Sequence, residues 1–279
     1  MKMVVSGIAD SSQGQIEVVN PFDGMVIDTV PRYTSNDVEQ AVSIARKGHE
    51  INRRMPVHKR ISILSKTAVL MQERFDELAT TIATEGSKTI REARKEVERA
   101  IQTIIISGEE ARRLNGETIP FDSAVGSENR VGYYYRFPIG IIAAITPFND
   151  PLNLVAHKVG PAIAGGNSVI LKPATETPLS ALKLSSCLHD AGLPQEVLTV
   201  VTGHGSEIGN VLVEHPEIRM ISFTGGEAAG ERIAKKAGLK KLSMELGSNS
   251  PVIVLDDCDL QQATEACVSG AFWAVGQNF

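Results

Sequence analysis

The pattern of apolar positions changes near the middle of the chain. From residue 35 to about 115, apolar side chains recur every three or four positions, which predicts long amphipathic helices. The first is expected to begin after the cap-like spacing of Thr34 and Asp37. A second predicted helix carries one stripe of Ile61, Leu64, Ala68, Met71, Phe75, Leu78 and Ile82. We expect these helices to pack against the rest of the fold rather than to carry catalytic residues.

From Pro138 onward, short β-rich runs alternate mostly with helical stretches. The runs are "IGIIAAI", "SVILK", "VLTVV", "RMISF", "KKLSM" and "PVIVL". Apolar strands that alternate with helices are typical of a parallel sheet covered on both faces. The sequence therefore predicts an α/β fold with a doubly wound, Rossmann-like sheet.

A break separates the two halves. Glycine, proline and asparagine interrupt the helical pattern after residue 114, and "VGYYYRF" has the composition of a strand, so we expect an exposed β-hairpin. Its three tyrosines, 133 to 135, alternate faces in a strand, which favours cross-strand packing or a subunit interface over an aromatic ligand cage. The predicted division is an N-terminal helical part (1–117), an oligomerisation-type hairpin (118–137), a Rossmann-like core (138–256) and the start of a catalytic domain (257–279).

Composition narrows the function classes. The chain has 279 residues, 42% of them hydrophobic, with 28 basic against 33 acidic side chains and no basic stripe, so a nucleic-acid partner is not expected. No apolar run has the length of a membrane span, and residues 1–15 lack the apolar region of a secretory signal. Three cysteines without paired spacing indicate a reducing, cytoplasmic location and exclude a disulfide framework or a metal site of the zinc-ribbon type.

The candidate chemistry follows the predicted strands, because open α/β sheets bind ligands beyond the carboxyl ends of their strands. "IGIIAAI" precedes Thr146, Pro147, Phe148 and Asn149; "SVILK" precedes Pro173, Ala174, Thr175 and Glu176; "RMISF" precedes "TGGEAAG" and a helix from about Glu227 to Lys236. Gly225 and Gly230 would let a helix N-terminus face a dinucleotide. The spacing is not the usual G-x-G-x-x-G, however, and such turns also occur without a nucleotide.

Two charged residues are ambiguous by themselves. Lys172, at a predicted strand end, is either a solvated surface lysine or, in a converging site, a ribose or phosphate ligand. Glu245, in "LSMELGSNSP", would act as a general base if burial raised its pKa. By spacing alone, a salt-bridged or helix-capping glutamate is the commoner case.

Together these segments resemble the aldehyde dehydrogenase superfamily. The matching stretches are "ITPFNDPLNLVAHKVGPAIAGGNSVILKPATETPLSA", "AGLPQEVLTVVTGHGSEIG", "ISFTGG" with Gly230, "MELGSNSP" and "GQN", in family order and with family spacing from about Pro138 to Asn278. The pairing of "PFND" with "ELGSNSP" is most similar to the branch that acts on phosphonoacetaldehyde or lactaldehyde-like compounds.

The resemblance implies a role for each matched position. Asn149 matches the amide of an oxyanion hole, and Glu245 matches the base that activates water. Lys172 matches the adenosine-ribose ligand, and Leu246 the neighbour of the nicotinamide. The positions implied for the cofactor, NAD or NADP, are Ile145, Thr146, Pro147, Phe148, Lys172, Ala174, Thr175, Gly205, Gly209, Phe223, Thr224, Gly225, Gly226, Gly230 and Leu246.

The nucleophile is the main departure from the family pattern. In the family a cysteine follows "GQN" at once, adds to the aldehyde and carries the acyl group, whereas this chain has Phe279 there. A phenyl ring forms no covalent adduct. Cys187, Cys258 and Cys267 match no catalytic position and are expected to be structural or surface thiols. We therefore expect a truncated, inactive chain.

Two further positions bear on specificity. Many NAD-preferring relatives have a glutamate at the position of Thr175, where its charge would repel a 2′-phosphate. Threonine removes that repulsion and leaves Lys172 to attract the phosphate, which predicts tolerance of NADP. The neighbouring carboxylate of Glu176 weakens this prediction. His157, on the helix expected to line the aldehyde tunnel, suggests a small polar or anionic aldehyde; a hydrogen-bonded helix histidine is equally compatible.

Two classes of function remain at this point. The leading one is the cofactor-binding part of an NAD(P)-dependent aldehyde dehydrogenase, with a homo-oligomer formed through the hairpin. The alternative is a non-catalytic nucleotide-binding or interaction module that associates with a full-length homologue. A third possibility is a chain that is only partly folded.

Overall fold

The structure is a computed structural model, and it describes residues 14–277. The first part of the N-terminal segment that lacks a secretory pattern, and Phe279, lie outside the described residues. A central sheet of five parallel strands has the order β7-β6-β5-β8-β9. Its strands are β5 (Ile141–Ile145), β6 (Ser168–Lys172), β7 (Leu198–Val200), β8 (Ile218–Thr224) and β9 (Lys241–Glu245). The predicted α/β fold is confirmed.

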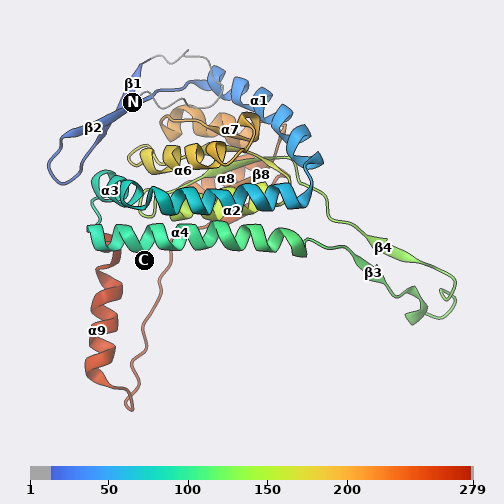
Figure 1. Cartoon of the computed structure of the whole chain (residues 1–279). Coiled ribbons are helices and arrows are strands. Elements are labelled where there is room, and N and C mark those ends of the chain that lie inside the picture. Colours follow the sequence, from blue (N-terminus) through green and yellow to red (C-terminus); the bar gives the residue numbers. More distant parts are fainter. Residues whose placement is uncertain (1–13, 278–279) are drawn as a thin grey trace.

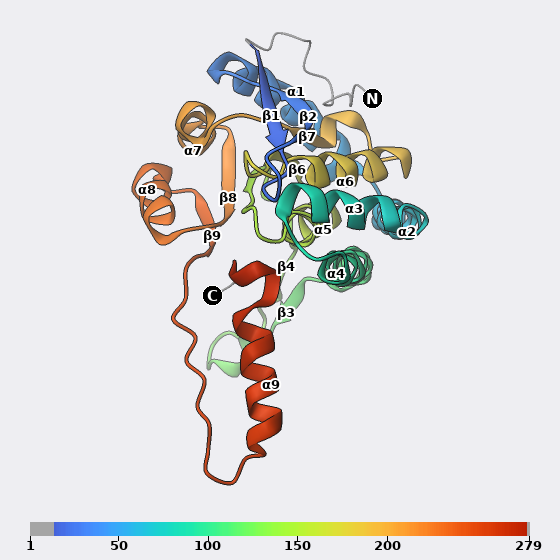
Figure 2. The ribbon, with the colours of Figure 1, turned by 90° about the vertical axis from the view of Figure 1, so that its left-hand side faces the viewer.

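Helices cover both faces of this sheet, as the doubly wound topology requires. In Figure 2, α7 and α8 lie on one side of β8, and α5 and α6 lie on the other side of the sheet. The bounds of these helices are α5 (Asn153–Ala164), α6 (Leu179–Asp190), α7 (Asn210–Glu214) and α8 (Glu227–Ala237). β5 and β6 are almost fully buried, which explains why their sequences are continuous apolar runs rather than alternating ones.

The N-terminal half supplies the predicted amphipathic helices. They are α1 (Ser35–Arg54), α2 (Val57–Glu73), α3 (Phe75–Gly86) and α4 (Ile90–Glu110). The start of α1 is confirmed, because the Asp37 carboxylate accepts hydrogen bonds from the Thr34 N–H at 2.6 Å and the Thr34 hydroxyl at 2.7 Å. The single second helix was a wrong prediction: its stripe runs over α2 and α3, which meet at Arg74, whose side chain turns aside to pair with Asp190 at 2.7 Å.

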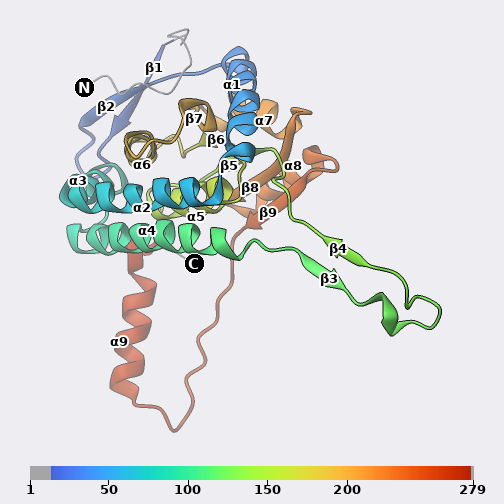
Figure 3. The same ribbon diagram turned by 45° about the vertical axis from the view of Figure 1, so that its right-hand side comes forward.

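Two antiparallel hairpins stand outside the main sheet. β1 (Gln15–Val19) and β2 (Val26–Pro31) form one that the sequence reasoning missed. β3 (Glu117–Ile119) and β4 (Gly132–Tyr134) form the predicted one, which projects away from the helices in Figure 3. Tyr133 and Tyr135 share one face there, with ring centroids 5.5 Å apart, and both are exposed. The expected exposed hairpin is thus confirmed.

The last predicted strand was wrong. Pro251–Leu255 forms no regular structure, and its apolar side chains are exposed. This stretch leaves β9 and runs away from the sheet to α9 (Leu260–Ala271), which has no buried residue (Figure 1). β-branched composition favours a strand only where a neighbouring strand can pair with it. Within residues 14–277, no helix combines the length and apolar character needed to cross a bilayer.

Candidate functional site

The strand register brings three predicted residues into one row at the carboxyl edge of the sheet. Ile145, the last residue of β5, lies opposite Lys172 of β6 on one side and Phe223 of β8 on the other. These residues come from segments far apart in the sequence. Parallel pairing places the ends of these strands at one edge, where doubly wound sheets bind their ligands.

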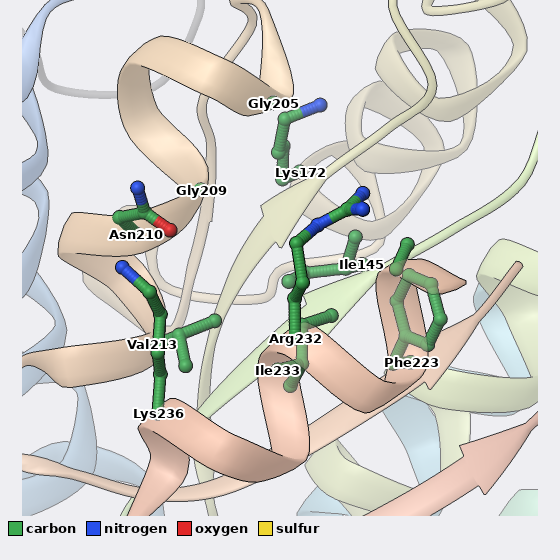
Figure 4. Close-up of a pocket in the computed structure, with 11 residues that line it drawn as sticks. Ile145, Lys172, Gly205, Gly209, Asn210, Val213, Phe223, Arg232, Ile233 and Lys236 are labelled. Atoms are coloured by element: carbon green, nitrogen blue, oxygen red, sulfur yellow. The ribbon is translucent and has the colours of Figure 1, made fainter. Parts of the chain in front are cut away.

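Next to this row is a cavity of about 170 Å³ between α7, α8 and the strand ends (Figure 4). The five predicted residues that line it are Ile145, Lys172, Gly205, Gly209 and Phe223. Its further lining residues are Asn210, Val213, Ala229, Arg232, Ile233 and Lys236. The apolar members form walls suited to a flat, uncharged ring, and the three cations lie among them.

The charge of the cavity is one-sided, since its lining contains three basic residues and no Asp or Glu. Lys172 is only 6% exposed, and burial lowers the pKa of its ammonium group, an effect that Glu176 partly opposes. Its Nζ donates to the carbonyl oxygen of Pro173 at 3.1 Å. Lys236 is paired with Glu214 at 2.8 Å. The buried cation fits an anionic ligand, and so does the absence of acid from the lining.

The glycine-rich turn after β8 lies beside the cavity. Gly226 immediately precedes α8, and the Gly225 N–H donates to the Glu245 carbonyl oxygen at 3.0 Å, which ties the turn to the end of β9. A Cβ on Gly230 would lie 2.4 Å from the Leu246 side chain, so only glycine fits there without a shift. A Cβ on Gly226 would meet no atom within 4 Å, so the start of α8 is open for a backbone approach to an anion.

The other predicted cofactor positions lie in the loops after β5 and β6. The Thr146 hydroxyl is buried and has no hydrogen-bond partner among the described residues, whereas Phe148 is exposed. The Thr175 hydroxyl donates to the Gly203 carbonyl oxygen at 3.3 Å. Thr224 is buried, and Pro147 and Ala174 are half-buried.

The two predicted catalytic residues follow β5 and end β9. The Asn149 amide donates to the Gln277 carbonyl oxygen at 3.2 Å, so the segment carrying "GQN" reaches this edge of the sheet. Glu245 is exposed at the end of β9, the edge strand of the sheet, so the buried position expected for a general base is not found among residues 14–277. Its charge instead acts on Lys158, whose pKa burial lowers to about 8 while Glu245 raises it.

A buried ion network holds the loop that carries Asn149. Lys88 contacts both Glu96, at 2.6 Å, and Asp150, and the side chains of Lys88 and Glu96 are almost completely inaccessible. The Glu96 carboxylate also accepts the N–H groups of Leu152 at 2.8 Å and Asn153 at 3.1 Å, at the start of α5. Burial raises the pKa of Glu96, whereas the Lys88 charge lowers it. Sequence periodicity gave no signal for this network.

His157 opens onto a groove of about 580 Å³ between α4 and α5. Arg99 lies in the same groove and is bonded to Asp150 at 3.2 Å. Burial first, and then the charges of Arg99 and Lys158, lower the pKa of His157, while Asp150 opposes them. Arg99 also lies over the Trp273 ring, 5.8 Å from its centroid. The groove thus holds the Arg99 cation, itself paired with Asp150, together with the His157 imidazole and the Glu98 carboxylate.

Sequence reasoning missed two basic residues of α8 and one of α4. Arg232 and Lys236 lie one helical turn apart after a glycine-rich turn, a pattern that identifies one helix face but not what it faces. Arg99 was not singled out because nothing in the sequence connects it with His157.

Comparison with known proteins gives one consistent result. The sequence pattern of the aldehyde dehydrogenase family matches residues 8–278. Aspartate-semialdehyde dehydrogenase 1 of Pseudomonas canavaninivorans is 53% identical over 94% of this chain and 56% of its own length. The 3-sulfolactaldehyde dehydrogenase of Priestia aryabhattai is 45% identical over 99% of this chain and 57% of its own.

A solved structure agrees in fold as well as in sequence. The NADP complex of glyceraldehyde-3-phosphate dehydrogenase GapN from Methanocaldococcus jannaschii superposes with a TM-score of 0.88 and 38% identity, over 92% of this chain and 56% of that one. The chain spans about half the length of the curated relatives it matches.

Proposed function

This chain belongs to the aldehyde dehydrogenase family, and we propose that it forms the NAD(P)-binding part of an enzyme that oxidises a small polar or anionic aldehyde to its acid. One observation carries the proposal: five implied cofactor residues from four separate segments line a single acid-free cavity at the carboxyl edge of the sheet. The division into residues 1–117, 118–137, 138–256 and 257–279 is part of the same proposal.

NAD(P), when bound, supplies the acceptor for the hydride of the aldehyde. In the proposal, Lys172 binds the adenosine ribose, and the main chain from Phe223 to Gly226 faces the pyrophosphate. The Asn149 amide donates to the aldehyde oxygen as negative charge develops on it. Glu245 takes a proton from the water that releases the acid, a role that needs a cover over β9 to exclude other water.

The proposed substrate class rests on the groove beside α5. A small anion in this groove, which Glu98 also lines, would meet Arg99 and His157 and would raise the pKa of the imidazole, because a nearby negative charge favours its protonated form. We propose monitoring the ring protons of His157 by NMR during titration with lactate and, separately, with the uncharged 1,2-propanediol. Only lactate is expected to raise the His157 pKa, and Arg99→Ala should abolish the effect. Equal responses to both compounds would contradict an anionic substrate.

We further propose that the 279-residue chain does not turn over aldehydes, because Phe279 stands at the nucleophile position. Purified chain with NADP or NAD is expected to give no aldehyde-dependent increase in absorbance at ~340 nm with lactaldehyde or aspartate semialdehyde. Reduction that depends on aldehyde and is lost in Glu245→Gln would refute this.

Binding is tested by calorimetric titration of the chain with NADP and then NAD. We expect saturable binding that Lys172→Ala weakens and Lys47→Ala leaves unchanged, because Lys47 is an exposed lysine on α1. If neither dinucleotide binds the folded chain, the proposed function is wrong.

The hairpin β3–β4 is the proposed contact with a second copy. It projects from the body, exposes aromatic side chains at 133 to 135, and has only one paired edge on each strand. Such edges accept a further strand.

A further inference from the structure

The turn that follows α9, residues 273–277 (the terminal turn), has a backbone conformation that its residues rarely adopt. Ala274 has a φ of 50° and Val275 a φ of 60°, both in the left-handed region, and Gly276 continues it with a φ of 72°. A β-branched residue such as valine is an outlier there. Such a conformation persists only where surrounding contacts hold it. The contacts of the terminal turn therefore identify what fixes it.

The helix that leads to the terminal turn is not itself packed. No residue of α9 is buried, and residues 251–255 before it are exposed as well. Within the terminal turn, by contrast, Ala274 is completely buried. In Figures 1 and 3, the end of α9 reaches the N-terminal half of α4. The terminal turn is thus seated on α4, at the far end of an otherwise exposed helix.

One carboxylate of α4 holds the main chain of the terminal turn. The Glu92 Oε1 atom accepts the Ala274 N–H at 3.1 Å, in partly buried surroundings. The Glu92 Oε2 atom accepts the Thr89 hydroxyl at 2.9 Å, as part of the capping box that begins α4. A hydrogen bond to a carboxylate is stronger than one between neutral groups. Glu92 therefore joins the start of α4 to the left-handed backbone of the terminal turn.

Two cations of the same helix face contact the neighbouring side chain. The Lys95 Nζ atom lies 5.3 Å, and the Arg99 guanidinium 5.8 Å, from the centroid of the Trp273 ring. Glu92, Lys95 and Arg99 follow one another at steps of three and four positions, which places them along one face of α4. Lys95 and Arg99 are exposed, and exposed cation–π contacts are weak. The Glu92 bond is therefore the main anchor, and the ring contacts orient the turn.

The same helix also fixes the group that the terminal turn meets. The Asn149 amide donates to the Gln277 carbonyl oxygen at 3.2 Å. The loop of Asn149 is held by the buried network of Glu96, which includes Asp150. Glu96 lies one helical turn after Glu92 on α4. One carboxylate of α4 thus places the loop of Asn149, and a second places the terminal turn.

We propose that Glu92 is a positioning residue, which anchors the terminal turn to α4 and thereby places the segment of Gln277 against the Asn149 amide. The meaning of this contact for a reaction rests on the proposed function, in which the Asn149 amide donates to the aldehyde oxygen. The inference adds to that function the residue that sets the geometry of the contact. The anchor itself requires no bound dinucleotide.

Trp273 reports on the anchor directly, because it is the only tryptophan of the 279-residue chain. In Glu92→Ala the ratio of seated to released turn is expected to fall about tenfold or more, the effect of losing one hydrogen bond to a charged group. The measurement is acrylamide quenching of the Trp273 emission in the chain without cofactor. The accessible fraction should rise, and the emission maximum should move to longer wavelength.

A second readout tests the positioning step. The side-chain N–H signals of Asn149, assigned by their loss in Asn149→Asp, are followed in a proton–nitrogen NMR spectrum. They should shift in Glu92→Ala, because the Gln277 carbonyl oxygen is no longer held beside them. Glu92→Gln keeps an oxygen that accepts the Ala274 N–H, so it should retain most of the quenching behaviour and of the Asn149 signals.

Thr89→Ala separates the anchor from the start of the helix. It removes the capping partner of the Glu92 carboxylate but leaves the acceptor of the Ala274 N–H in place. Both readouts should therefore change far less than in Glu92→Ala. Glu109→Ala, which removes an exposed carboxylate near the C-terminal end of α4, should change neither.

Unchanged Trp273 quenching in Glu92→Ala would overturn the inference. A released Trp273 with unmoved Asn149 signals would overturn it as well, because the turn would then be anchored without placing Gln277. An equal response to Thr89→Ala would refute it by assigning the effect to the start of α4. Failure of NADP and NAD to bind, with both readouts as expected, would instead refute the proposed function and leave the anchor supported.

Discussion

Glu85 makes the stability of this chain depend on pH in a direction opposite to that of most carboxylates. It lies near the end of α3, is almost completely buried, and accepts the N–H groups of Leu179 at 2.7 Å and Ser180 at 2.8 Å, together with the Ser180 hydroxyl. These contacts at the start of α6 lower its pKa, but burial outweighs them and raises the pKa to about 7.

The sign and size of this pH dependence follow from the linkage between proton binding at Glu85 and folding. Because the folded state holds the Glu85 proton more tightly than the unfolded state, the folded chain is favoured at low pH, and stability is lost as pH rises from about 4.5 to about 7. Between pH 5 and pH 8 this single group is expected to lower the free energy of unfolding by about 2 to 3 kcal/mol.

Urea unfolding of the wild-type chain and of Glu85→Gln at pH 5 and pH 8 measures this effect. Gln does not titrate, so the stability difference between the two proteins should shift by about 2 to 3 kcal/mol in favour of the variant at pH 8. A difference that stays constant with pH would refute the raised pKa. A shift in the opposite direction would show that the hydrogen bonds and the helix N-terminus outweigh burial.

Three further predictions concern packing and association. Glu96→Ala should lower the free energy of unfolding by about 3 to 5 kcal/mol, since it removes one of the two carboxylates beside the buried Lys88 ammonium group and the acceptor of two buried N–H groups, whereas the exposed Glu98→Ala should change it by less than ~0.5 kcal/mol in the same urea titration. Gly48→Ala places a Cβ 1.8 Å from a main-chain carbonyl oxygen of the turn before β7, so thermal unfolding should show a loss of about 1 to 3 kcal/mol; Gly86→Ala, with no atom within 4 Å, serves as its control, and equal midpoints would contradict the close packing of α1. Tyr135→Lys should shift sedimentation equilibrium toward the monomer without altering the unfolding midpoint, and an unchanged mass distribution would argue against the hairpin as the contact between copies.

Local pattern was sufficient for much of the fold. The Thr34 and Asp37 spacing located the start of α1 because a capping box is formed within four residues. The apolar runs that became β5 and β6 predicted a buried parallel sheet, because strands covered on both faces have no polar side to alternate with. The pattern failed where contacts with other elements matter. Residues 251–255 have strand composition but no paired strand within residues 14–277, and the helix break at Arg74, which pairs with Asp190 of α6, left no mark on the apolar stripe.

In the candidate site, too, some features follow from the sequence alone and others only from the tertiary structure. By itself, the sequence determined the residues at the strand ends and the glycine-rich turn, and through them the family, because these features depend on residue type and spacing along one chain. Only the tertiary structure decided that Arg232 and Lys172 line one cavity, that Arg99 shares a groove with His157, and that Glu245 lies exposed. Those facts depend on which helices cover which strand, and so on contacts between residues far apart in the chain, which no local period records.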